Sequence, residues 1–193
     1  MSNENRAFII GNGESRKDFD LSLLNDQVTF GCNALYRVYC PTYIVSIDPM
    51  MVKEVQTTWK YANMSLIIPS AEEQYEPAEY NPARPRSNAG MNCMIEAVKR
   101  DFTNLYCIGM DFLLADPEGS TSNMFDGTQN YGPETRTSLN DSRARMGYFG
   151  WYLEKNPNID FTFIFNKDDK VYKPQIDNFN LIHYDELSNI LKD

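Results

Sequence analysis

Residues 7–15 read AFIIGNGES, and this stretch decides the fold. Its first half, AFII, is a short apolar run of the kind that forms a strand covered on both faces. Its second half, residues 11–15, follows at once with glycines and polar residues. Glycine lets backbone N–H groups approach an anion, so a strand followed directly by such a turn is typical of α/β folds that bind phosphate. Arg16 replaces the third glycine of the dinucleotide fingerprint, which argues against a standard NAD site.

The rest of the chain alternates short apolar runs with amphipathic stretches, the pattern of βαβ units. We expect strands over residues 7–10, 28–32, 43–47, 66–68, 105–108, 161–165 and 181–183. We expect helices over residues 49–61, 88–101, 137–155 and 184–191. The pattern predicts a Rossmann-like α/β fold with a mostly parallel sheet and helices on both faces. Residues 1–193 are expected to form a single nucleotide-binding domain.

Two stretches are poor in regular structure. Residues 70–87 are rich in proline, and residues 116–133 are rich in Gly, Ser, Thr and Asn. Long loops inside compact domains often serve as lids over a site. Both segments are therefore candidate lids, and disordered segments are the alternative.

Polar clusters stand where the expected strands end. Ligands of open α/β sheets bind at the carboxyl ends of strands, so these clusters are expected to converge on one anion. The expected ligand residues are Gly11, Asn12, Gly13, Asn33, Asp48 and Asp111. Simpler roles stay open: a tight turn for residues 11–13, a turn residue for Asn33 and a helix cap for Asp48. For Asp111, contact with a ribose, a base or a metal is expected.

A further cluster, Arg86-Ser87-Asn88-Ala89-Gly90, precedes the helix expected at residue 88. A helix N-terminus favours anions, so Asn88, Ala89 and Gly90 form a second candidate anion site. Arg86 is expected to add a charge-assisted hydrogen bond to a phosphate or carboxylate, and an ordinary surface position is its alternative role.

Composition limits the function classes. The chain has 193 residues, a net charge of -9 and a sequence pI of about 4.7, so binding to nucleic acid is not expected. It has no apolar run of the ~20 residues that a transmembrane helix needs and no signal peptide, and a cytoplasmic location is expected. The cysteines form no CxxC pair, so a structural zinc site is not expected, and the lone His183 is expected to be structural.

Five short motifs stand in the order and approximate spacing of a known family. They read GNGES (11–15), FGCNALY (30–36), SIDPMM (46–51), RSNAGMNCMIEAV (86–98) and LYCIGMDF (105–112). Over this span the chain resembles the bacterial lipooligosaccharide sialyltransferases. The resemblance implies a Rossmann-like domain of the glycosyltransferase-A kind, a CMP-linked sugar donor and a glycan acceptor. It also implies that Asn12, Asn33 and Asp48 contact the donor and that Arg86 heads a matching segment.

Residues that perform sialyl transfer in that family are replaced here. Where the family holds the departing phosphate with two tyrosines, this chain has Leu113 and Asn123, with Tyr131 further on. The region of the family's catalytic histidine, residues 135–145, reads TRTSLNDSRAR. Asp111 and Asp141 are therefore our candidates for the general base.

Three functions follow as alternatives. The first is a glycosyltransferase that takes a sugar from a nucleotide-sugar donor. The second is a nucleotide-binding protein without transferase activity. The third resembles the 6-hydroxymethyl-dihydropterin pyrophosphokinase-like proteins, with Asp48 and Asp111 holding Mg²⁺ against nucleotide phosphates. The sequence leaves both a monomer and an oligomer open.

Overall fold

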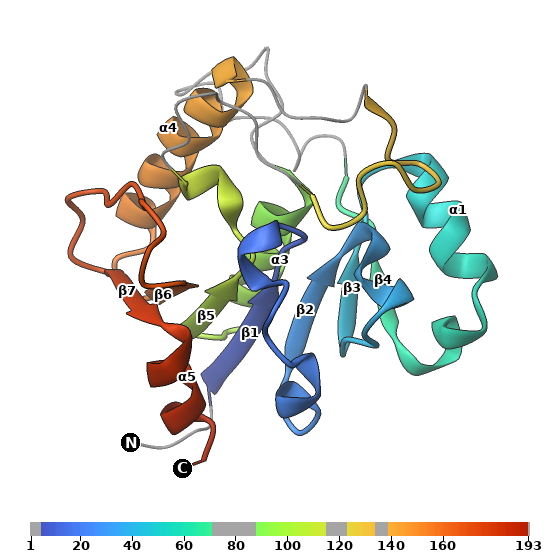
Figure 1. Ribbon diagram of the computed structural model, residues 1–193, viewed down its shortest axis with the longest axis horizontal. Coiled ribbons are helices and arrows are strands. Elements are labelled where there is room, and N and C mark those ends of the chain that lie inside the picture. The colour runs from blue at the N-terminus through green and yellow to red at the C-terminus, as the bar shows by residue number, and fades with distance from the viewer. Residues whose placement is uncertain (1–4, 71–87, 115–122, 134–138, 193) are drawn as a thin grey trace.

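A parallel sheet runs through the centre of the molecule (Figure 1). The computed structural model describes residues 5–70, 88–114, 123–133 and 139–192, with residues 139–142 described by their helical backbone alone. The strands in these residues are β1 (Arg6–Ile10), β2 (Thr29–Cys32), β3 (Tyr43–Val45), β4 (Ser65–Ile67), β5 (Asn104–Ile108), β6 (Asp160–Phe165) and β7 (Phe179–His183). Their order across the sheet is β4-β3-β2-β1-β5-β6-β7, and neighbouring strands in that order are parallel.

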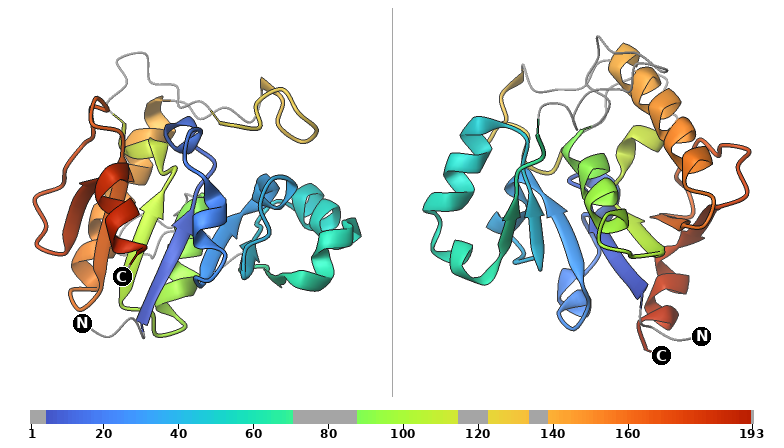
Figure 2. Two further views of the ribbon diagram at one scale, coloured as in Figure 1. Left: turned by 60° about the horizontal axis from the view of Figure 1, so that its bottom comes forward. Right: turned by 180° about the vertical axis from the view of Figure 1, so that it is seen from behind.

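Helices cover both faces of the sheet (Figure 2). The α-helices are α1 (Pro49–Thr57), α3 (Ala89–Val98), α4 (Leu139–Lys155) and α5 (Tyr184–Ile190). Short 3₁₀-helices are η2 (Glu14–Arg16), η3 (Leu21–Leu24), η4 (Asn33–Arg37), η5 (Trp59–Asn63) and η6 (Asp111–Leu113). α3 and α4 pack on one face, whereas η3, η4, α1 and α5 contribute to the core on the other.

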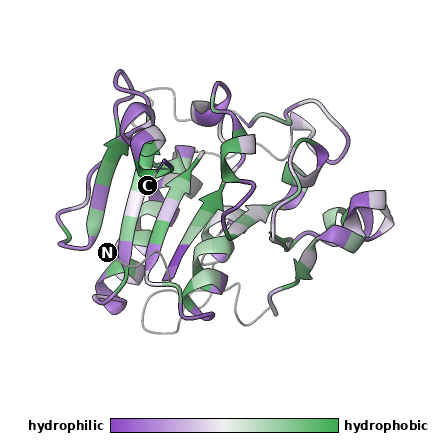
Figure 3. Cartoon of the chain, turned by 90° about the horizontal axis from the view of Figure 1, so that it is seen from below, coloured by the Kyte–Doolittle hydropathy of each residue, from purple (hydrophilic) through white to green (hydrophobic). Residues whose placement is uncertain are grey.

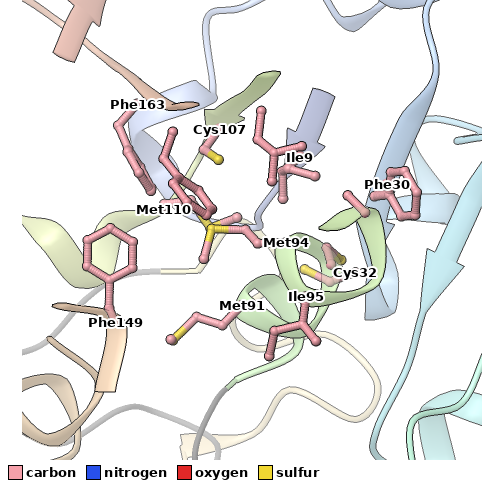
Figure 4. Close-up of a cluster of buried hydrophobic side chains, with 14 of the residues drawn as sticks. Ile9, Phe30, Cys32, Met91, Met94, Ile95, Cys107, Met110, Phe149 and Phe163 are labelled. Atoms are coloured by element: carbon pink, nitrogen blue, oxygen red, sulfur yellow. The ribbon is translucent and has the colours of Figure 1, made fainter. Parts of the chain in front are cut away.

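The central strands β1, β2, β5 and β6 are largely apolar because both of their faces are buried, whereas the edge strands β4 and β7 are only partly buried; Figure 3 shows the hydrophobic residues of the sheet. In β1, Ala7 and Ile9 belong to the cluster beneath α3 and α4, and Phe8 and Ile10 belong to the opposite cluster. Figure 4 shows the first cluster, where Ile9 lies among side chains of β5 and α3. Burial of a large apolar side chain stabilises the fold by about 1.5–3 kcal/mol, so this alternation holds helices on both faces.

The order of the strands reverses between β1 and β5. From β1 the chain builds β2, β3 and β4 outward on one side and then returns to place β5 against β1, pairing Ile10 with Ile108. Connections therefore leave the carboxyl ends of these two strands in opposite directions, which opens a crevice there. The residues after β1 and after β5 face each other at this switch point.

The predicted Rossmann-like α/β fold is confirmed, and the sheet is entirely parallel over the described strands. The helix expected over residues 49–61 is divided. Thr58 has an extended backbone (φ -77°, ψ 149°) and ends α1. The Thr57 hydroxyl donates to the carbonyls of Lys53 and Glu54, a local bond that competes with helix propagation. Among the described helices, none is both long and apolar enough to cross a membrane.

Candidate functional site

A cavity of about 220 Å³ lies at the carboxyl ends of β1, β2 and β5, at the switch point. The predicted ligand residues whose side chains are described all line it. The lining residues are Gly11, Asn12, Gly13, Cys32, Asn33, Asp48, Met51, Asn88, Ala89, Gly90, Gly109, Met110, Asp111, Phe112, Asn123, Asp126, Asn130, Tyr131 and Arg145. Arg86 lies outside the described residues, and so does the side chain of Asp141. We call this cavity the cleft.

The glycines after β1 are required by contacts inside the protein. A Cβ at Gly11 would stand 2.3 Å from the carbonyl oxygen of Gly109, where β1 and β5 come close together. A Cβ at Gly13 would stand 2.1 Å from Cγ of Asp111. These approaches account for the glycines without a ligand, so the glycine pattern is weaker support for a phosphate site than the sequence suggested.

The backbone amides of this loop are also used internally. Gly11 N–H donates to the carbonyl of Ile108 at 2.8 Å, and Gly13 N–H donates to the carbonyl of Gly109 at 3.0 Å. The expectation that these two amides are open to a phosphate is therefore wrong. Gly11 and Gly13 form part of the cleft wall, and their N–H groups donate hydrogen bonds that join the end of β1 to the end of β5.

Asp111 lies in the position where the predicted loop would hold an anion. The backbone N–H of Ser15 donates to Oδ2 of Asp111 at 3.1 Å, and the hydroxyl of Ser15 donates to Oδ1. The side chain is 6% exposed. Burial raises the pKa of Asp111, and the hydrogen bonds from Ser15 act against that rise. Because both oxygens already accept hydrogen bonds, this geometry favours a structural role over the predicted role of general base.

Asn12 joins the ends of β1 and β2. Its Nδ2 donates to the carbonyl of Cys32 at 3.0 Å, and its Oδ1 accepts from Nη2 of Arg16 at 3.3 Å. The guanidinium of Arg16 is 2% exposed and also donates to the carbonyl of Gly11. Burial lowers the pKa of Arg16. The buried arginine therefore fixes the orientation of the Asn12 amide at the cleft wall.

Asn33 presents a hydrogen-bond donor to the cleft. Its backbone is left-handed (φ 47°), a conformation that Asn tolerates better than most residues. Its Oδ1 accepts from the hydroxyl of Ser46 at 2.9 Å, which fixes the orientation of the amide. Within the described part of the chain its Nδ2 has no acceptor, so this group is available to a ligand oxygen.

Asp48 has the capping role that was the alternative to ligand contact. Its Oδ1 accepts from the backbone N–H of Met50 at 2.8 Å, and Pro49 occupies the first turn of α1. The Mg²⁺ hypothesis pairs this carboxylate with Asp111, whose oxygens are bonded to Ser15. Over the described residues, no group of three or more His, Cys, Asp or Glu side chains is placed to hold a metal ion. Mg²⁺ binding stays a prediction.

The N-terminus of α3 forms the part of the cleft with open backbone donors. Asn88 caps the helix by accepting from the N–H of Met91 at 2.9 Å. Ala89 and Gly90 occupy the first turn and line the cleft, and their N–H groups have no acceptor among the described residues. Amides at a helix N-terminus carry partial positive charge and favour an anion. This arrangement matches the second anion site expected from the sequence.

Two residues that we did not assign to the site complete this region. Arg145 reaches the cleft from α4 and brings a cation, the role that we had assigned to Arg86. Tyr131 lines the cleft near Asn12 and Asn33; it is 7% exposed, and its hydroxyl has no hydrogen-bond partner within 3.5 Å among the described residues. Burial raises the pKa of Tyr131 to about 12, so the phenol keeps its proton at neutral pH. A buried hydroxyl without a partner is unfavourable, so an oxygen of a ligand or of a water in the cleft would stabilise it.

Tyr131 belongs to a loop that is closely bound to the cleft. Gly13 and Asn123 form an antiparallel bridge, and the N–H of Met124 donates to the carbonyl of Asn12 at 2.9 Å. Phe125 and Tyr131 are buried against each other, with ring centroids 5.9 Å apart. Residues 123–131, which belong to one of the expected lid segments, thus form a wall of the cleft; movement of this wall stays a prediction.

An ion pair holds this wall to α1. Arg37 and Glu54 are 2.6 Å apart, and both side chains are mostly buried. Arg37 also donates to the Thr128 hydroxyl at 2.7 Å and the Gln129 carbonyl at 2.8 Å. Asn130 donates to the other oxygen of Glu54 at 2.6 Å. Neither partner stood out in the sequence, because a surface-type Arg and Glu separated along the chain carry no motif.

The cleft therefore contains two chemically different regions. Its donors are the amides of Ala89 and Gly90 at α3, the Arg145 guanidinium from α4 and the Tyr131 hydroxyl, which lies near Asn12 and Asn33. Toward α1 and the wall it offers the carboxylates of Asp48 and Asp126. A ligand with an anionic group and several hydroxyl groups would match both regions, because carboxylates accept hydrogen bonds from hydroxyls.

Comparisons with known proteins add little to this geometry. The chain matches no family model and no curated protein. Among solved structures, a UDP-glucose 4-epimerase aligns with a TM-score of 0.28 and 10% sequence identity, over 84% of this chain and 52% of that chain. This chain thus spans about half the length of that protein. A likeness at this TM-score carries no argument about function.

Proposed function

We propose that this chain is a glycosyltransferase that binds a nucleotide-sugar donor in the cleft, with the donor phosphate at the N-terminus of α3. The observation that carries the proposal is the buried Tyr131 hydroxyl without a partner, which shares the cleft with the open amides of Ala89 and Gly90. Donors of this kind suit the oxygens of a phosphate. Arg145 supplies the opposite charge.

The same donors support the chemistry of transfer. As the bond between sugar and phosphate breaks, negative charge builds on the leaving phosphate. Fixed hydrogen-bond donors that face this charge stabilise the transition state. Tyr131 is a neutral donor at pH 7, and burial, which raises its pKa to about 12, keeps it neutral in alkaline solution as well. Removal of one such donor from an oxyanion site typically lowers kcat by about 10²–10³.

Sugar and ribose hydroxyls fit the other region of the cleft. Asp48 and Asp126 accept hydrogen bonds, and the Asn33 amide donates one. The resemblance to sialyltransferases suggests a CMP-linked donor. Of the predicted bases, Asp141 stands one helical turn before Arg145 on α4 and stays our candidate on sequence grounds.

The test compares Tyr131→Phe with Tyr172→Phe. Tyr172 is exposed and does not line the cleft, so its variant controls for loss of a phenol elsewhere. Calorimetry with CMP, UDP and GDP should find at least one nucleotide that binds to the wild type. This nucleotide should bind more weakly to Tyr131→Phe and with unchanged affinity to Tyr172→Phe. Absence of binding to all these nucleotides would refute the proposal.

A nucleotide-binding protein without transferase activity is the second candidate. It is favoured by the Asp111 carboxylate, because both its oxygens accept hydrogen bonds from Ser15 and hold the loop after β1, a structural use of the carboxylate. Product analysis with the corresponding nucleotide-sugar and a panel of glycan acceptors separates the two. Sugar transfer that Asp141→Asn abolishes supports the transferase. Nucleotide binding without any transfer supports the second candidate.

A further inference from the structure

We propose that Asp111 determines the phosphate specificity of the cleft, because its carboxylate prevents a phosphate from binding at the loop after β1. The cleft then accepts one phosphate, at α3, and discriminates against a ligand whose second phosphate reaches this loop. The inference rests on the proposed nucleotide binding and assigns to Asp111 a selective role that its predicted role as a base did not include.

The carboxylate occupies the loop as a bound anion would. Ser15 gives it a backbone N–H at 3.1 Å and a hydroxyl. Gly13 lets it approach, since a Cβ at residue 13 would lie 2.1–2.5 Å from the atoms of the carboxyl group. In dinucleotide-binding folds the turn after the first strand holds the pyrophosphate with backbone amides. Here the chain's own side chain has taken that place.

The two glycine amides of the loop do not replace the donors that Asp111 uses. Within the described residues, the N–H groups of Gly11 and Gly13 are bonded to carbonyls of β5. A phosphate at this loop would therefore find few donors and would lie beside a buried carboxylate of the same charge. Charges of like sign repel more strongly at a water-poor site than in bulk water. By contrast, Ala89 and Gly90 line the cleft, and their N–H groups have no acceptor among the residues that the structure describes.

Asp111→Asn is the direct test, because the amide keeps the size of the side chain and removes its charge. Its matched control is Asp126→Asn, which removes the same charge from another wall of the cleft. Dissociation constants are measured by calorimetry for CMP and CDP, and for UMP and UDP, at one pH and salt concentration. The quantity compared is the ratio of the diphosphate constant to the monophosphate constant.

The wild type should bind the monophosphates at least about tenfold more tightly than the diphosphates. Asp111→Asn should reduce this ratio at least about tenfold, whereas Asp126→Asn should change it by less than about threefold. An unchanged ratio in Asp111→Asn, or an equal fall in both variants, would overturn the inference. If Asp111→Asn fails to fold, Asp111→Ser serves instead, and a wild type that prefers diphosphates overturns the inference without any variant. If the wild type binds none of these nucleotides, the proposed function has failed instead.

Discussion

Gly13 and Asp111 are packed so closely that residue 13 has no room for a side chain. A Cβ there would stand 2.1 Å from Cγ of Asp111, although the backbone of Gly13 (φ -68°, ψ 150°) is one that alanine adopts readily. The glycine is therefore needed for the carboxylate of Asp111 and for no conformational reason of its own. This contact ties the turn after β1 to the turn after β5 across the switch point.

Gly13→Ala should lower the free energy of unfolding by about 2 kcal/mol or more, because the added methyl group overpacks a buried contact. The clash is specific to one partner. In the Asp111→Ala background the same change should cost less than half as much, a coupling that a double-mutant cycle by urea denaturation measures. Equal costs in the two backgrounds would show that Gly13 is required for another reason.

Tyr131 should make the stability of the fold depend on alkaline pH. Its pKa in the folded state, raised by burial to about 12, lies above the value of 10.0 expected for an unfolded tyrosine. This contribution is fully present below pH 10 and is lost as the pH rises toward 12, by up to about 1.4 kcal/mol for each pH unit. Over this window the wild type should therefore lose stability relative to Tyr131→Phe, which has no group that titrates at residue 131. Parallel curves would contradict the burial of the phenol.

The ion pair between Arg37 and Glu54 should control the cleft wall. Glu54→Gln removes the charge that Arg37 faces at 2.6 Å, and we expect a loss of about 1–3 kcal/mol in stability. Hydrogen exchange at the amides of Met124 and Gly127 should become faster, since the first donates from the wall to the carbonyl of Asn12 and the second donates to Tyr131 within the wall. The control is Asp185→Asn, which breaks the exposed pair with Lys167 and should change stability by less than about 1 kcal/mol. Equal exchange rates in the two variants would show that the ion pair does not stabilise the wall.

The periodicity of the sequence was sufficient for the fold. Apolar runs such as residues 7–10 and 161–165 are strands because both of their faces are buried, and this burial leaves a clear pattern. Asp48 and Asn88 cap α1 and α3, as the residue types at those positions indicated. Local rules therefore predicted the elements and the positions of the polar residues at their ends.

The hydrogen-bond partners of these polar residues could not be predicted from local sequence rules. That Asp111 would bond to Ser15, far away in the sequence, depends on β5 pairing with β1. Glycines that serve a neighbouring carboxylate look the same in a sequence as glycines that serve a phosphate. Tyr131 was considered beside the family's tyrosine positions and set aside because its spacing differs, and Arg145 was not assigned, because the two residues reach the cleft from a loop and from a helix at no fixed spacing from a motif.

The most direct test follows the backbone amides during titration of isotope-labelled protein with CMP by nuclear magnetic resonance. An amide that gains a bond to phosphate moves strongly downfield, whereas one already bonded to a carbonyl changes little. We predict the large downfield shifts at Ala89 and Gly90, with Gly11 and Gly13 nearly unmoved because their N–H groups donate to Ile108 and Gly109. Large shifts at Gly11 and Gly13, with Ala89 and Gly90 unaffected, would contradict a phosphate site at α3.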